Sequence, residues 1–349
     1  MAPQSAVLFD EYLPTATQSM AQGAAVAAAL RALVATSIEL ADRLAGEHDS
    51  PLIEVVTDRN GEGDAQHRLD ALAHQLFTRS LRTAPVRAVL SEEAVDPIEN
   101  SRDGQVVVAI DPIDGSSNLD VNGAIGTIFS ILPAVADDAQ PHASFMVTGD
   151  HQLAAGLVLY GPATVLALTL GSGTDLFVLD RTRATFVLAR SSISVPDQAG
   201  AFAVNMSNRR HWPSLVRRYV DDLLAGTAGV RERDFNMRWV GALVADAFRI
   251  LNDGGIYLYP GDDRPGYRNG RLRLVYEGNP IALLIEQAGG AASNGFERIL
   301  SIQPEAFHQR TPFLFGSSDE VRRCVDRLDR HPNHGSDSPL FTSRGIFRD

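Results

Sequence analysis

The stretch that decides the fold is VVVAIDPIDGSSN, residues 106–118. Its first five residues are all apolar, as in a strand that is covered on both faces. Such a strand delivers Asp111 to its carboxyl end, the edge at which open α/β sheets place their ligands. Pro112 cannot continue the hydrogen-bond ladder, so we expect the chain to turn there and to fold Asp114 back beside Asp111.

The residues after Asp114 have the chemistry of a phosphate site. Gly115 lets the backbone approach a ligand closely, and Ser116 and Ser117 offer hydroxyl and amide groups. A helix that began here would attract phosphate to its N-terminus. An Asp-Pro turn alone is common in any protein. Two carboxylates with this turn and Asn118 after a buried strand instead indicate hard cations with phosphate oxygens laid across them.

Working outward, further acidic residues stand before this stretch. Glu92 and Glu93 follow an expected strand at 86–90. Neighbouring strand residues point to opposite faces, so both reach one cage only if the backbone bends. The local pattern leaves this pair open between a solvated strand end and metal ligands. It favours a helix cap for Asp64 and an exposed helical position for Asp70.

The segment RLRLVYE, residues 271–277, is typical of a strand that ends at Glu277. In a straight strand Arg271 and Glu277 would lie about 20 Å apart, so they could serve the two ends of an extended ligand but not one phosphate. Asn279 and Pro280 are expected to open a helix. Glu277 alone would be interpreted as a helix-dipole carboxylate.

The composition narrows the class of protein. The 349 residues carry a formal net charge of −12, which argues against nucleic acid or an anionic membrane as partners. All 31 basic residues are arginine, so any fixed cation for a phosphate is a guanidinium. Cys324 is the only cysteine, which excludes an intrachain disulfide. With no export signal and no apolar stretch expected to cross a bilayer, we expect a cytoplasmic protein.

The segment DPIDGSSNLD at 111–120, followed by GTIF at 126–129, resembles the active-site signature of class I fructose-1,6-bisphosphatases. GDAQHRLDALAH, LSEE, AAGLVLYGPATVL, RWVGALVAD, GGIYLYP, GRLRLVYEGNPIALLIEQAGG and HQRTP are similar to further family segments in family order. The resemblance spans roughly residues 50 to 330. The shorter DPxDG element also belongs to the wider Li⁺-sensitive phosphatases, inositol monophosphatases included. The additional segments favour the sugar bisphosphatase.

The resemblance implies roles for individual residues and reverses three of the local interpretations above. It implies metal binding by Glu92, Glu93, Asp111, the carbonyl of Ile113, Asp114 and Glu277. It implies that Asp64, Asp70 and Glu93 activate the attacking water. It implies that Asp114, Gly115, Ser116 and Ser117 hold the reacting phosphate, and that Asn205, Asn208, Arg238, Trp239, Tyr259 and Arg271 hold the remote end of the substrate.

The resemblance also implies an architecture and a reaction. The expected fold is α/β, with two stacked sheets and helices between and around them. We expect an N-terminal domain at 1–198, a substrate domain at 199–330 and a tail at 331–349. The expected reaction removes the 1-phosphate of fructose 1,6-bisphosphate, in gluconeogenesis or the Calvin cycle, with sedoheptulose 1,7-bisphosphate as a further substrate. It would use two or more Mg²⁺ ions per subunit, with Mn²⁺ or Zn²⁺ as alternatives. The implied assembly is a homotetramer in which Arg238 reaches a neighbouring subunit.

Some positions depart from the family pattern. Asn208 and Trp239 stand where tyrosines are usual, and Arg271 replaces a lysine. Trp239 is open between a core aromatic and a substrate contact. The basic-aromatic pair of the family's AMP site is replaced by Gln105-Val106, and Leu132-Pro133 stands where an arginine is expected, so we expect weak AMP inhibition or none.

Two alternatives remain beside this interpretation. An inositol monophosphatase-like hydrolase would have no use for an anion pocket around Arg238, Tyr259 and Arg271. A non-catalytic regulatory protein on the same fold would not need the intact carboxylates. Asp246, between two alanines on an expected helix, is interpreted as structural and paired with Arg249.

Overall fold

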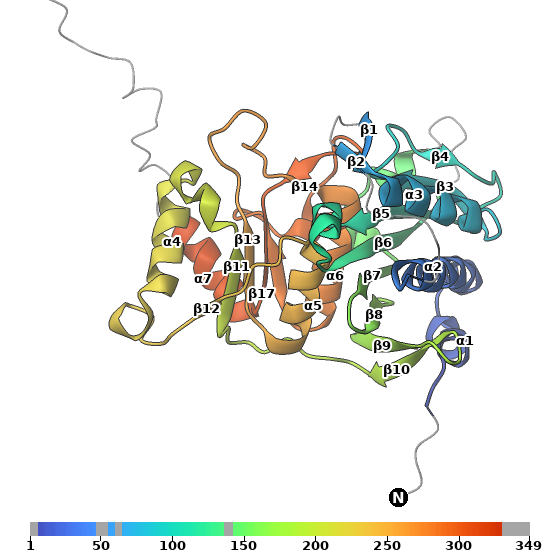
Figure 1. Ribbon diagram of the computed structural model, residues 1–349, viewed down its shortest axis with the longest axis horizontal. Helices are drawn as coiled ribbons and strands as arrows, with labels where there is room; N and C mark the ends of the chain where they lie inside the picture. The colour runs from blue at the N-terminus through green and yellow to red at the C-terminus, as the bar shows by residue number, and fades with distance from the viewer. Residues whose placement is uncertain (1–5, 47–54, 60–64, 136–141, 330–349) are drawn as a thin grey trace, which may run out of the picture.

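The computed structural model describes residues 6–46, 55–59, 65–135 and 142–329. Asp64 and the tail at 331–349 lie outside the described residues. Two β-sheets are stacked with a layer of helices between them, formed by α5 (Leu243–Asp253) and α6 (Asn279–Gln287) (Figure 1). Further helices cover the outer faces of the two sheets. The expected α/β fold with two stacked sheets is confirmed.

The larger sheet is built from strands that all lie before residue 191. Its eight strands are, in spatial order, β10 (Thr185–Arg190), β9 (Thr174–Asp180), β8 (Thr164–Thr169), β7 (Ala154–Tyr160), β6 (Ile125–Pro133), β5 (Val106–Asp114), β3 (Val86–Ser91) and β4 (Ile98–Glu99). Neighbouring strands pair antiparallel except β3 and β5, which are parallel. The central strand β5 is buried along its whole length.

The second sheet and the short ribbons come mostly from the C-terminal half. The sheet contains, in spatial order, β12 (Asn236–Met237), β11 (Ala201–Val204), β13 (Ile256–Tyr259), β17 (Phe313–Gly316) and β15 (Ala291–Ser293). Two ribbons pair β1 (Val55–Arg59) with β2 (Ala65–His67), and β14 (Leu272–Arg273) with β16 (Arg310–Thr311).

Apolar side chains pack between these layers. The outer helices are α1 (Phe9–Thr17), α2 (Gly23–Leu44) and α3 (Arg68–Leu81) on the large sheet, and α4 (Ser214–Leu224) and α7 (Ser318–Asp329) on the small one. Side chains alternate across each strand. In β7, Val158 accordingly packs toward the outer helices, whereas Leu157 packs toward α5 and α6. Both sheets therefore hold α5 and α6 in an apolar interlayer.

Two expectations about the site segments are wrong in detail. β5 does not end before Pro112 but continues to Asp114, because its register against β6 shifts between Asp111 and Asp114. A bulge of this kind tolerates proline. The expected strand at 271–277 is also wrong: only β14 is extended, and a π-helical turn, η6 (Leu274–Gly278), leads directly into α6.

The long helix α2 qualifies the expectation about membranes. Gly23–Leu44 is long and apolar enough to cross a bilayer by length and composition alone, contrary to what we expected from the sequence. Most of that window is buried inside the protein, where it packs against α1, α3 and the large sheet. A buried core helix satisfies the same length and composition test.

Candidate active site

Three buried carboxylates converge between the two sheets. Oxygen atoms of Asp111, Asp114 and Glu277 all lie within 4.8 Å of one another. Asp111 and Asp114 come from β5, and Glu277 comes from η6. These side chains are 2%, 8% and 4% exposed. Buried carboxylates at this separation repel one another when they are ionised. They therefore either bind a cation or stay partly protonated.

The bulge in β5 aims both of its carboxylates. The backbone N–H of Ile113 donates to Oδ1 of Asp111 at 3.0 Å. Oδ2 of Asp114 accepts a hydrogen bond of 2.7 Å from the N–H of Val244, in the first turn of α5. Asp114 therefore also receives the favourable field of a helix N-terminus.

The π-helical turn brings Glu277 to this point. A straight strand at 271–277, as expected from the sequence, would carry Glu277 away from the residues that precede it. In η6 the chain instead coils, and Oε2 of Glu277 accepts a 2.6 Å hydrogen bond from the backbone N–H of Arg273. The guanidinium of Arg273, which is buried, forms an ion pair with Oε1 of Glu92 at 3.1 Å. Arg273 is a residue of this site to which the sequence analysis assigned no role, although it stands four positions before Glu277.

Glu92 and Glu93 lie just past the end of β3, where the backbone bends as required. The N–H of Glu92 donates to the carbonyl of Ile110 in β5 at 3.1 Å. The N–H of Glu93 donates to Oγ of Ser91 at 3.3 Å, and that hydroxyl also contacts Nδ1 of His74 at 2.9 Å. Asp70, expected from local pattern alone to be exposed, is buried in the first turn of α3.

Burial and like charge shift the protonation of the cluster. Burial raises the pKa of Asp111 well above its usual range, and the charge of Glu92 adds to this shift. Burial raises the pKa of Glu277 in the same way, with Glu92 again the main charged neighbour. The pKa of Asp114 rises to about 7 through burial, although the hydrogen bond from Val244 opposes the rise. Without a cation, the protein environment therefore favours the protonated form of these carboxylates. A bound cation would favour their ionised form.

The expected phosphate-binding turn follows Asp114 directly. Gly115 has φ +79°, and a Cβ atom there would lie 2.5 Å from Cβ of Ala242. A 3₁₀ turn, η1 (Ser116–Val121), begins at the next residue, and Ser117 is exposed. Gly115 thus combines a left-handed backbone with a close approach that only glycine permits.

Residues expected at the remote end of the substrate gather around Tyr259. Asn205, Asn208 and Tyr259 line one small recess. The Trp239 ring stacks on Tyr257 with centroids 5.7 Å apart and lies 6.2 Å from the ring of Tyr259. Trp239 is half-buried, so it is both a packing residue and a wall of this region.

The two arginines expected at the remote end of the substrate lie in different surroundings. Burial raises the pKa of Tyr259, and the positive charge of Arg271 opposes that rise. Arg271 also lies over the ring of Tyr267, 4.9 Å from its centroid. Arg238 is exposed on the surface of this chain. Asp246, on α5, pairs with Arg249 at 3.4 Å, which confirms its structural interpretation.

Comparisons with known proteins give a consistent result. Residues 23–191 match the family model "Fructose-1-6-bisphosphatase, N-terminal domain", and residues 195–329 match the corresponding C-terminal domain model. A Bradyrhizobium diazoefficiens protein named fructose-1,6-bisphosphatase class 1 is 48% identical over 341 residues, 97% of this chain and 98% of that protein. A Sinorhizobium medicae protein of the same name is 52% identical over 291 residues, 83% of each chain. The fold is similar to that of Leishmania major fructose-1,6-bisphosphatase in holo form, with a TM-score of 0.85, 31% identity, and coverage of 94% of this chain and 100% of that one.

Proposed function

Because the chain belongs to the fructose-1,6-bisphosphatase family, we propose that it removes the 1-phosphate of fructose 1,6-bisphosphate with the help of bound divalent cations. It is a phosphoric monoester hydrolase, and the products are fructose 6-phosphate and inorganic phosphate. The observation that carries the metal dependence is the cluster of Asp111, Asp114 and Glu277, buried and within 4.8 Å of one another.

The donor atoms of this cluster fit a hard cation. They are all carboxylate oxygens, the ligand type that Mg²⁺ and Mn²⁺ prefer, whereas Zn²⁺ favours nitrogen and sulfur. Asp111, Asp114 and Glu277 would hold one ion. Glu92, Glu93 and the Ile113 carbonyl would serve a second, with Glu92 exchanging its pairing with Arg273 for the metal. When bound, such ions acidify a water molecule and neutralise phosphate oxygens.

The chain's own residues then supply position and proton transfer. Glu93 and Asp70 orient the attacking water and take its proton, and Asp64, outside the described residues, supports them. The amides of Ser116 and Ser117 hold the reacting phosphate, because Gly115 lets this turn approach closely. Asp70 lies on α3 and Glu93 follows β3, and the packing of both elements against β5 supports this assignment.

The remote phosphate would lie near Tyr259. Asn205 and Tyr259 offer polar groups in the recess, and Arg271 provides a bidentate guanidinium in place of a point charge. Arg238, exposed on this chain, would complete the same pocket of a neighbouring subunit in a cytoplasmic homotetramer. Because Trp239 and Asn208 alter the pocket wall, we also propose that sedoheptulose 1,7-bisphosphate is accepted.

One kinetic comparison tests this function. Phosphate release is measured from fructose 1,6-bisphosphate, sedoheptulose 1,7-bisphosphate and inositol monophosphate, each with Mg²⁺, Mn²⁺, Zn²⁺ or a chelator. We expect both bisphosphates to be hydrolysed with Mg²⁺ or Mn²⁺ and no turnover with the chelator. Equal turnover of inositol monophosphate would favour the inositol monophosphatase alternative, and no phosphate release with any metal would favour a regulatory protein.

The anion pocket is tested separately with a matched pair of arginines. Arg271→Ala should raise KM for fructose 1,6-bisphosphate by about 10- to 100-fold, because it removes a charged contact to substrate. Arg268→Ala, three positions earlier and exposed, should leave KM within about twofold. A KM that changes equally in both variants would contradict a specific role for Arg271.

A further inference from the structure

The three clustered carboxylates come from two segments that lie far apart in the sequence. Asp111 and Asp114 are fixed by β5 in the large sheet, whereas Glu277 lies in η6, the turn that leads into α6. A metal cage needs its ligands held to within about 0.5 Å. Contacts between the start of α6 and the large sheet must therefore fix their relative position.

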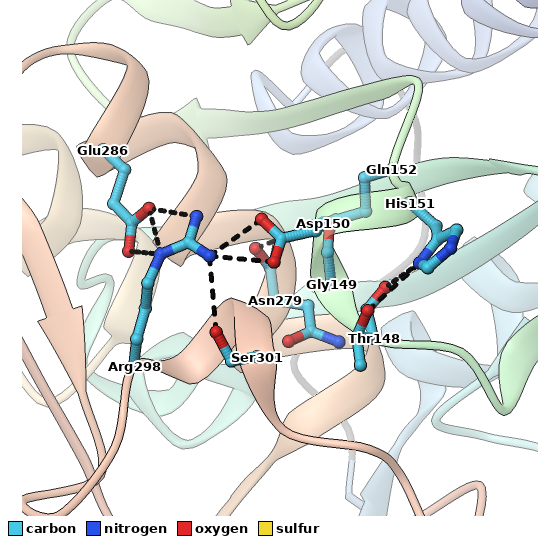
Figure 2. A network of polar contacts seen from close by, with 9 residues as sticks. All are labelled: Thr148, Gly149, Asp150, His151, Gln152, Asn279, Glu286, Arg298 and Ser301. Atoms are coloured by element: carbon cyan, nitrogen blue, oxygen red, sulfur yellow. Dashed lines mark hydrogen bonds and ion pairs between the residues drawn. The ribbon is translucent and has the colours of Figure 1, made fainter.

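Gln152 makes such a connection. Its Nε2 donates to the backbone carbonyl of Asn279 at 3.1 Å and to the carbonyl of Gly149 at 2.9 Å (Figure 2). Asn279 is the first residue of α6 and lies two positions after Glu277. The next residue after Gln152, Leu153, donates its N–H to Ile131 in β6 at 2.8 Å. Because β6 pairs directly with β5, Gln152 ties the Glu277 segment to the sheet that holds Asp111.

The turn that presents Gln152 is packed tightly against α6. This turn, η3 (Gly149–His151), begins at Gly149, where a Cβ atom would lie 2.7 Å from Oδ1 of Asn279 and 2.7 Å from Cδ2 of Leu300. Gln152 itself is 8% exposed. Its hydrogen bonds are thus shielded from water. A hydrogen bond has its largest effect on structure in such a buried environment.

A second connection joins the same turn to the other end of α6. Arg298 donates to Asp150 in η3 at 2.8 Å and to Glu286 in the last turn of α6 at 2.7 Å (Figure 2). Arg298 and Asp150 are 43% and 49% exposed, so solvent screens their pairing. This exposed ion pair contributes far less to positioning than the buried amide of Gln152, and it provides an internal control.

We infer that Gln152 is a positioning residue for the metal carboxylate Glu277. Its amide group faces two carbonyl oxygens, and only the NH₂ side of the amide can do so without acceptors facing each other. The start of α6 is thereby held at one distance from β6, and Glu277 is held opposite Asp111 and Asp114. This role rests on the proposed metal-dependent function.

The test measures binding of Mn²⁺ alone, by electron paramagnetic resonance titration of the full chain. Gln152→Glu keeps the size but turns an acceptor toward both carbonyls. Gln152→Met removes the donors without adding charge, and it carries the test if the first variant does not fold. We expect both to weaken Mn²⁺ binding by about 10- to 100-fold, the usual effect of losing a contact that supports a metal ligand. Asp150→Asn, in the same turn, should bind Mn²⁺ within about twofold of the unmodified chain.

The outcomes separate the two proposals. Lower melting temperatures with unchanged Mn²⁺ affinity in the folded Gln152 variants would show a merely structural residue and overturn the inference. Mn²⁺ binding by the unmodified chain together with normal affinity in Gln152→Met would do the same and leave the proposed function intact. If the unmodified chain bound no Mn²⁺, the proposed function itself would be overturned, and the role of Gln152 with it.

Discussion

Asp111 is almost fully buried beside Asp114 and Glu277, and burial together with the charge of Glu92 raises its pKa. Its ionised form therefore destabilises the metal-free protein, whereas the proposed reaction requires it. We expect Asp111→Asn to raise the melting temperature without metal, to abolish the rise produced by Mn²⁺, and to lower kcat/KM by at least about 100-fold. Differential scanning fluorimetry with and without Mn²⁺ and a phosphate-release assay measure the three effects.

The matched control is Asp246→Asn, because Asp246 is a buried carboxylate that has a cationic partner. It pairs with Arg249 and accepts from the N–H of Val240 at 3.3 Å. Burial raises the pKa of Asp246 as well, but the N–H of Val240 and the charge of Arg249 oppose that rise. Asp246→Asn should therefore change the metal-free melting temperature much less than Asp111→Asn does, and the Mn²⁺ effect should persist. The expected result is that Asp111→Asn stabilises the metal-free protein and removes the response to Mn²⁺, whereas Asp246→Asn keeps that response. A metal-free Asp111→Asn protein less stable than the unmodified chain would contradict charge repulsion in the cluster.

Gly115 allows a second test at this scale. Gly115→Ala places a residue at φ +79° and brings its Cβ within 2.5 Å of Ala242. The strained backbone should cost about 1–2 kcal/mol, and the clash should displace the turn at Ser116 and lower kcat. Gly171 has nearly the same backbone, φ +85°, with no atom within 4 Å of an added Cβ. Gly171→Ala should lose similar stability but keep kcat, and a matching loss of kcat would remove the special role of Gly115.

At the scale of elements, local pattern predicted the strand before Asp111 but not its end. The apolar run at 106–110 is buried throughout, as periodicity indicates. The continuation past Pro112 depends on the register of β6, a partner far along the chain, which no local signal at Pro112 reveals. The alternating pattern at 271–277 is equally compatible with a strand and with a turn buried on all sides, and burial of the whole of η6 explains why the period failed.

The N-terminal helices α1 and α2 bear on the prediction that AMP inhibits the enzyme weakly or not at all. α1 and α2 pack on each other so closely that an added Cβ at Gly23 would lie 2.0 Å from the carbonyl of Thr17. On their outer surface Arg31 pairs with Asp10 at 3.0 Å. Gln105 and Leu132 offer no cation for a nucleotide phosphate. We expect millimolar AMP to leave the initial rate unchanged within about twofold. Activity is measured over a range of AMP concentrations at subsaturating substrate, and half-inhibition at micromolar AMP would contradict the prediction.

At the scale of the whole molecule, the α/β class and the order of the segments could be read from the sequence, but the convergence of the site could not. Asp70, Glu93, Asp111 and Glu277 are spread over more than half of the chain, and three of them have ordinary local explanations. What brings Glu277 to Asp111 is the stacking of two sheets around α5 and α6. Only the resemblance to a family carried that long-range information, and local reasoning left Arg273 and Gln152 without a role.

This stacking makes one prediction about cooperativity. Both tryptophans, Trp212 and Trp239, lie after residue 199, so tryptophan fluorescence follows the C-terminal half, whereas far-ultraviolet circular dichroism follows the entire chain. A cation shared by β5 and η6 must be released when either half unfolds. Mn²⁺ at about 100 times its Kd should therefore stabilise both transitions by about 2.7 kcal/mol and keep them coincident.

The variant Glu277→Gln isolates the connection between the halves, because Asp111 and Asp114 remain in place on β5. In this variant Mn²⁺ should no longer shift the tryptophan transition by more than about a third of the original amount, since the C-terminal half no longer supplies a charged ligand. Thermal unfolding followed by both signals, with and without Mn²⁺, gives the comparison. If Mn²⁺ moved only the circular dichroism transition of the unmodified chain, the ion would be held by the N-terminal half alone and Glu277 would not be a ligand.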